Sequence, residues 1–247
     1  MQISDDIYLG PAVVGGSNSS SGPSNMTVGA GPLGRSFCFD VVPAASGTTV
    51  TQNQLSVSAN LPAGNLVLAA GTGVTASVDA TGVTRYVLDS PRSIAIYSAA
   101  NHSGSTLLIS GYDQYGFAMS ELVTGPNVTT VQSAKCFKSV TSIFSSGAIA
   151  SACVVGLGTF IGLPYRLTDL GYVMSVMFNQ TAITISSTAV KVADATSPAT
   201  TTTTDVRGSI NCGQTDNAKR LVVNYSLPAL AVGPNATRIG AVGVTQV

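Results

Sequence analysis

The sequence predicts an all-β fold: an antiparallel β-sandwich or jelly roll preceded by an extended N-terminal arm. Helical periodicity is nearly absent, and short runs of Val, Ile, Thr, Leu, Tyr and Phe are broken by Gly, Pro, Asn, Asp or Ser at intervals of about 8–12 residues. Polar and apolar residues alternate in stretches such as 83–89 and 137–143, as half-solvated antiparallel strands require. Residues 1–34 are instead rich in Gly, Ser and Pro, which favours an arm that wraps a partner or becomes ordered on assembly.

The β-domain is expected to extend over residues 35–247, with a possible sub-boundary near 163–171. Either a second unit begins at that loop, or the later strands complete one pair of sheets. The tract 196–205 is rich in Thr and predicts a surface loop or an edge strand. The expected strands are 35–42, 54–59, 65–70, 73–78, 82–89, 92–98, 105–112, 117–124, 135–143, 148–156, 159–163, 172–178, 182–187, 189–193, 219–227 and 236–244.

The charge content argues against two classes of partner. Lys and Arg number 11, as do Asp and Glu, and charged residues make up 9% of the chain, against about 25% in typical domains. A chain this neutral lacks the basic footprint of a nucleic-acid binder and has little attraction for anionic lipid.

The uncharged run 147–165 approaches membrane-spanning length, but Gly and Ser interrupt it, so a pair of buried strands is expected. The acidic N-terminus predicts no secretory signal. Low charge promotes association with other proteins.

No arrangement of residues predicts a metal, cofactor or nucleophile site. The four cysteines, Cys38, Cys136, Cys153 and Cys212, form no C-x-x-C pair and lie among β-forming neighbours, so free thiols that act as small core residues are expected. The single histidine, His102, lies in a turn-like segment without a G-x-S-x-G motif, which favours a solvated loop residue.

Asp113 and Glu121 lie eight residues apart and raise the question whether they form a catalytic acid pair. A glycosidase needs two carboxylates about 5–10 Å apart. Residues 113–116 fit a type I turn with Asp first and Gly fourth. If the flanking strands pair across this turn, Glu121 lies opposite Leu108 or Ile109, at the other end of the second strand, and is expected to face water or a neighbouring subunit. The sequence therefore predicts a protein that is not an enzyme, and a β-rich polysaccharide hydrolase is a minor alternative.

The segment 89–143 resembles a pattern common in structural proteins of tailed bacteriophages. Its pieces are a "PR-x-I" strand, a strand–turn–strand "ISG-D-x-x-G-x-x-x-x-E-x-V-x-GPN" and a "K-x-F-x-x-V-T-S-I" strand; residues 203–229 are similar to a second piece, "DVRG…RLVV-x-Y". The resemblance implies a virion protein with a β-sandwich or jelly-roll fold. The role implied is a capsid cement (decoration) protein on the capsid exterior, a homotrimer or homodimer bound to the major capsid protein. The alternative is a tail, fibre or head-fibre component that recognises the host surface.

Within the arm, the expected partner-binding residues are its bulkiest apolar side chains, Ile3, Ile7, Tyr8 and Leu9. Removal of residues 1–34 is then expected to abolish capsid binding and to leave the β-domain folded.

Overall fold

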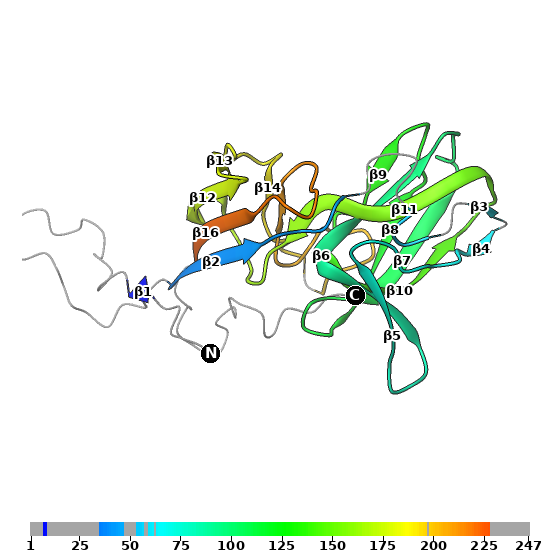
Figure 1. Ribbon diagram of the computed structural model, residues 1–247, viewed down its shortest axis with the longest axis horizontal. Helices are drawn as coiled ribbons and strands as arrows, with labels where there is room; N and C mark the ends of the chain where they lie inside the picture. Colours follow the sequence, from blue (N-terminus) through cyan, green and yellow to red (C-terminus); the bar gives the residue numbers. More distant parts are fainter. Residues whose placement is uncertain are drawn as a thin grey trace, which may run out of the picture.

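The computed structural model describes residues 7–8, 35–46, 53–56, 59–61, 63–196 and 198–227; over these residues the protein consists of strands and loops with one 3-10 turn at Leu170–Tyr172. The strands form a larger sheet of eleven strands and a smaller sheet of five. Figure 1 shows the smaller sheet at one end of the molecule and the larger, strongly curled sheet at the other. The predicted all-β, sandwich-like fold is confirmed.

The larger sheet is antiparallel throughout its described pairings. Its strand order is β14 (Val190–Lys191), β15 (Ser209–Asn211), β11 (Ile149–Gly162), β6 (Thr84–Ser98), β10 (Phe137–Ser145), β7 (Thr106–Tyr112) and β8 (Ala118–Thr124). At its sides β3 (Ala59–Leu61) pairs with β11, β4 (Gly64–Asn65) with β10, and β5 (Val74–Val78) and β9 (Thr130–Gln132) with β6. The hairpin of β5 and the start of β6 projects from the body (Figure 1).

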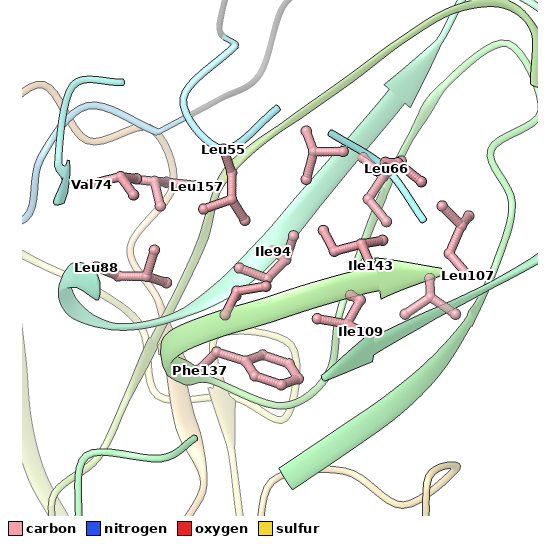
Figure 2. Close-up of a cluster of buried hydrophobic side chains, with 14 of the residues drawn as sticks. Leu55, Leu66, Val74, Leu88, Ile94, Leu107, Ile109, Phe137, Ile143 and Leu157 are labelled. Atoms are coloured by element: carbon pink, nitrogen blue, oxygen red, sulfur yellow. The ribbon is translucent and has the colours of Figure 1, made fainter. Parts of the chain in front are cut away.

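The main core lies on the inner face of this curled sheet. Side chains on β7 and β8 alternate between buried and more exposed positions, because successive residues of a strand point to opposite faces. Leu55 and Leu66 cover the core, and their backbone N–H groups donate to Val155 and Ile143 on β11 and β10 at 3.0 and 2.8 Å. Each fully buried Leu, Ile or Phe stabilises the fold by about 1.5–3 kcal/mol. Figure 2 shows the convergence of Leu55, Leu66, Val74, Leu88, Ile94, Leu107, Ile109, Phe137, Ile143 and Leu157.

A second core lies between the smaller sheet and the β14–β15–β11 end of the larger one. The smaller sheet has the order β1 (Ile7–Tyr8), β2 (Arg35–Val41), β16 (Leu221–Leu227), β12 (Val173–Phe178) and β13 (Thr181–Ala182). Leu221, Val223 and Tyr225 of β16 are buried against a cluster that includes Ile161 of β11 and Ile210 of β15. The chain thus passes from the first core to the second along β11. Division into separately folding units near 163–171 stays a prediction.

Two strands are longer than the sequence predicts, because bulges replace the expected breaks. The strands expected at 148–156 and 159–163 form the single strand β11, whose register with β6 shifts between Leu157 and Ile161. Side chains satisfy the backbone there: Thr159 N–H donates to Gln132 Oε1 at 2.8 Å. A Cβ at Gly158 would lie 2.1 Å from Ser93 Oγ, so glycine lets the neighbouring side chain fill the bulge. The strands expected at 82–89 and 92–98 likewise join as β6.

Of the remaining predicted strands, some have nearly the predicted length and others are much shorter. Those at 35–42, 73–78, 105–112, 117–124, 135–143, 172–178 and 219–227 are confirmed within about two residues. Those at 54–59, 65–70, 182–187 and 189–193 shrink to pairs, triplets or single bridges, and β9 and β15 were not predicted. The described residues of 196–205 form a loop. The strand expected at 236–244 lies outside the described residues.

Candidate interaction surface

The predicted arm anchors are only partly described. Ile7 and Tyr8 form β1, which pairs antiparallel with Ser36 and Arg35 of β2. Ile3 and Leu9 lie outside the described residues. Partner binding by these four residues stays a prediction.

Asp113 makes the predicted turn and also a buried ion pair. Its Oδ1 accepts the N–H groups of Tyr115 and Phe117 at 2.8 and 2.9 Å, and Gly116 adopts φ 82°, a conformation that favours glycine. Its Oδ2 lies 2.6 Å from an Nη of Arg207, with exposed side-chain fractions of 1% and 3% for the acid and the arginine. The guanidinium also stands 4.8 Å from the ring centre of Tyr115. This turn is therefore fastened to a loop 94 residues away.

Glu121 does not face water or a neighbouring subunit, so that expectation is wrong. It lies opposite Ile109, as one of the expected registers places it, but on the inner face, with 6% of its surface exposed. Its two carboxylate oxygens accept the N–H groups of Ala134 and Lys135 at 2.7 and 2.8 Å. Burial raises the pKa of Glu121 to about 7, although these donors act in the opposite direction.

Asp205 joins the two carboxylate sites into one network. Its Oδ2 accepts the N–H of Cys136 at 2.9 Å and its Oδ1 accepts that of Arg207 at 2.8 Å. Burial raises the pKa of this carboxyl. The Lys135 ammonium donates to the carbonyls of Ser120 and Thr200 at 2.9 Å each, so strand β8, the entry to β10 and the loop 199–208 are held together. Asp113 and Glu121 have separate partners, and each secures backbone.

Arg92 performs a similar task between the two sheets. Its side chain is fully buried. One Nη donates to the Ala44 carbonyl at 2.7 Å, and the other donates to the Gly158 carbonyl and the Thr215 hydroxyl at 2.7 and 2.9 Å. Three chain segments therefore meet at one guanidinium, whose rigid fork of donors suits this geometry.

The structure corrects two expectations about single residues. His102 is not solvated: it is 7% exposed, and its backbone N–H donates to the Pro126 carbonyl at 2.7 Å. Of the four cysteines only Cys38 is exposed, while the other three are buried as expected. Burial raises the pKa of Cys153 and Cys212 to about 11 and that of Cys136 well above its usual value, so these thiols remain protonated near neutral pH.

Within the described residues, no group of three or more His, Cys, Asp or Glu side chains is placed to hold a metal ion. A search of the same residues for a helix of sufficient length and apolarity to span a membrane finds none.

The outer face of β10, β7 and β8 carries an apolar row that the sequence did not reveal. Phe144 on β10 pairs in register with Leu108 on β7, which pairs with Leu122 on β8; beyond Phe144 the polar Asn65 of β4 ends the row. Phe144 and Leu122 are 45% and 41% exposed, and Leu108 is half-buried. Side chains opposite each other in adjacent strands are in contact range. The row is therefore a continuous apolar stripe rather than scattered exposed residues.

Beside this row the same face is hydroxyl-rich and uncharged. The next row of the sheet is Ser142, Ser110 and Ser120. A hollow of about 420 Å³ lies over Ser110, Gly111, Tyr112, Ala118, Met119, Ser120 and Thr141, none of which is charged. Arg85 borders it, with its guanidinium 3.8 Å from the ring centre of Tyr112, and also holds Asp79 at the hairpin tip. We name the row and this hollow the outer apolar face.

Comparison of the chain with protein-family models, with curated proteins and with solved structures finds no match. The edge of the sheet beside the outer apolar face is covered, because the N–H of Leu122 on the terminal strand β8 donates to the Thr201 carbonyl at 2.8 Å. A partner would therefore engage the face of the sheet at this point rather than extend it.

Proposed function

We propose that the chain is a non-enzymatic structural protein of a tailed-bacteriophage particle, bound as a homo-oligomer to the outside of the major capsid shell as a cement protein. The observation that carries the proposal is the outer apolar face, with Phe144, Leu108 and Leu122 in register among serines and threonines. A surface lined by apolar and hydroxyl side chains, with no charged residue in the row or in the lining of the hollow, suits a large protein partner better than a small charged ligand.

Two further features support this role. The buried carboxylates Asp113, Glu121 and Asp205 accept backbone N–H groups, so their chemistry is used to hold loops. The chain is neutral and sparsely charged, which favours association. The motifs quoted from 89–143 and 203–229 resemble those of phage structural proteins, and the cement role and the capsid exterior location come from that resemblance.

The test is imaging of particles assembled with wild-type or variant protein in place of the native chain. The variant Leu122→Ser/Phe144→Ser removes two partly exposed apolar side chains, so the free energy of unfolding is expected to fall by no more than about 2 kcal/mol. Occupancy on the capsid surface is expected to fall at least tenfold. Ile185→Ser is the matched control, an aliphatic residue 37% exposed in the connection between β13 and β14; its occupancy is expected to equal that of wild type.

Two results would contradict the proposal. Density for the wild-type chain on the tail or on fibres would favour the host-recognition role instead. Full capsid occupancy by the double variant would show that the outer apolar face does not contact the capsid.

A further inference from the structure

Residues 198–205 form a strap over the outer edge of β8. The N–H of Thr203 donates to the Thr200 carbonyl at 3.2 Å, so the middle of this segment turns back on itself. Next to this turn, the Thr201 carbonyl accepts the N–H of Leu122 at 2.8 Å. Leu122 belongs to the terminal strand of the larger sheet, so the strap occupies a position at which a further strand would otherwise pair.

The strap is closed at its base and can therefore move as a unit. The N–H of Asp194 donates to the Asp205 carbonyl at 2.8 Å, and Oδ2 of Asp194 accepts the N–H of Thr204 at 2.9 Å. Ala199 in the strap and Val206 just after it are buried together. A short segment whose ends meet and whose own side chains fill it is a compact unit that can open while the sheet stays folded.

The strap is attached to the sheet at the entry to β10, beside Glu121. The Lys135 ammonium donates to the Thr200 carbonyl at 2.9 Å, and the backbone N–H of Lys135 donates to Glu121 at 2.8 Å. The next backbone N–H, that of Cys136, donates to Asp205 at 2.9 Å. Glu121 on β8 and Asp205 at the end of the strap thus hold adjacent peptide groups. A change in the charge of Glu121 therefore acts at the point where the strap is attached.

The charged groups that act on Glu121 lie on the entry to β10 and on the strap. Burial is the main cause that raises the pKa of Glu121 to about 7; the Lys135 ammonium lowers this pKa, and the Asp205 carboxylate raises it. Asp194, at the base of the strap, acts on Lys135. The neighbouring strands β7 and β9 contain no charged residue. Opening of the strap admits water to Glu121 and moves Asp205 away, so it returns the pKa of Glu121 toward 4.5.

We propose that residues 198–205 are a proton-controlled strap, which closes the edge of β8 while Glu121 is protonated and opens as Glu121 ionises. The closed state binds the proton more tightly than the open state, so a rise in pH favours opening. Opening frees the N–H of Leu122 on the terminal strand, which gives the sheet a site for strand addition by a partner protein. This device does not depend on capsid binding, and its test uses purified full-length protein.

The test is amide hydrogen exchange, followed residue by residue by nuclear magnetic resonance from about pH 5.5 to about pH 8.5. Each exchange rate is divided by the rate of an unstructured amide at the same pH, so the change that remains reports structural opening. Opening that returns the pKa of Glu121 from about 7 to 4.5 increases the opening constant by up to about 30-fold across this range. We expect the corrected rate at Leu122 to rise by at least about tenfold.

The adjacent amide of Val123 is the internal control. The N–H groups alternate in direction along a strand, so that of Leu122 points to the strap and that of Val123 points to β7. At each pH, the corrected rate at Leu122 is expected to be at least about tenfold higher than that at Val123. Equal corrected rates at the two positions would overturn the strap, because both amides would then be freed only when the sheet itself opens.

The variant Glu121→Gln tests whether the proton on this side chain controls the strap. It removes the titrating group, so the corrected rate at Leu122 is expected to change less than about twofold over the same pH range. Asp79→Asn is the matched control, a carboxylate in the turn between β5 and β6, and should retain the wild-type rise. A wild-type rate that is independent of pH, or a rise that persists in Glu121→Gln, would overturn the proton control. The comparison of Leu122 with Val123 needs wild type alone, so it stands even if Glu121→Gln does not fold.

Discussion

The buried ion pair between Asp113 and Arg207 is expected to be a main determinant of stability. The variant Arg207→Met removes the guanidinium that lies 2.6 Å from Asp113 Oδ2 and leaves a carboxylate that is 1% exposed. Breaking a buried pair by removing one partner costs about 3–5 kcal/mol, since the remaining charge has neither its partner nor water. Asp113→Asn retains an Oδ1 for the N–H groups of Tyr115 and Phe117 but leaves the arginine uncompensated, so a similar cost is expected.

The double variant Asp113→Asn/Arg207→Met isolates the interaction itself. With both charges gone, neither member of the pair stays buried without its partner, and the loss is expected to be about 2–3 kcal/mol smaller than the sum of the two single losses. The exposed pair of Asp40 and Arg220 is the matched control, with side-chain exposures of 34% and 64%. Its cycle is expected to show a coupling below about 1 kcal/mol, because water and salt screen it.

The measurement is equilibrium unfolding in urea, followed by far-ultraviolet circular dichroism because the chain has no Trp. A typical domain has only about 5–15 kcal/mol of stability, so a single variant that unfolds without denaturant is measured in sucrose or trimethylamine oxide together with wild type. The reasoning is refuted if Arg207→Met costs no more than Arg220→Met, or if the two losses at Asp113 and Arg207 simply add.

Two other predictions follow from the titratable groups. Burial raises the pKa of Glu121 from 4.5 to about 7, so the folded state binds the proton more tightly than the unfolded chain. The free energy of unfolding should therefore fall by up to about 3 kcal/mol as the pH rises from 4.5 to 7. In urea titrations across this range, the free energy of unfolding of Glu121→Gln should depend less on pH than that of wild type. An equal pH dependence in the two proteins would contradict the raised pKa of Glu121. Titration with a maleimide should modify one of the four thiols, Cys38, in native protein and all four in denaturant; rapid labelling of a second native thiol would show that a core opens.

The fold class was predictable because polar and apolar residues alternate along strands such as β7 and β8. The alternation of β7 and β8 and the turn at Asp113–Gly116 are local properties of the sequence, and so are their strand lengths. The bulges that join the two halves of β11 were not predictable. They depend on Gln132 and Ser93, which come from other parts of the chain to satisfy the backbone at residues 159–160.

The adjacent residues Glu121 and Leu122 explain why the site was harder to predict than the fold. Glu121 is in phase with Met119 and Val123, which are buried, so the alternation itself places it inward. Its charge argues for the opposite face, and the N–H groups of Ala134 and Lys135 that compensate for burial arrive only with tertiary structure. Leu122 is exposed because the same alternation along β8 places it on the outer face. A charged residue is thus buried and its apolar neighbour is exposed, the opposite of what their side chains predict. Glu121 belongs to the buried hydrogen-bond network, and Leu122 belongs to the outer apolar face.

The motifs that resemble phage structural proteins can now be divided by the face on which their residues lie. Of the charged residues that define them, all but one are buried and hold backbone segments together: Arg92, Asp113, Glu121, Lys135, Asp205 and Arg207. The exception is Arg220, which is exposed and pairs with Asp40. The position after Glu121, which the motif leaves free, is the exposed Leu122, and Phe144 lies directly after the last motif strand. The buried charges of the motifs therefore fasten loops onto a curled sheet. Under the proposed function, we expect the choice of partner to depend on residues outside the motifs. Substitution at the buried charges should lower the free energy of unfolding by several kcal/mol and leave the capsid occupancy per folded molecule unchanged. Substitution at Leu122 or Phe144 should lower that occupancy at a cost in stability of no more than about 2 kcal/mol.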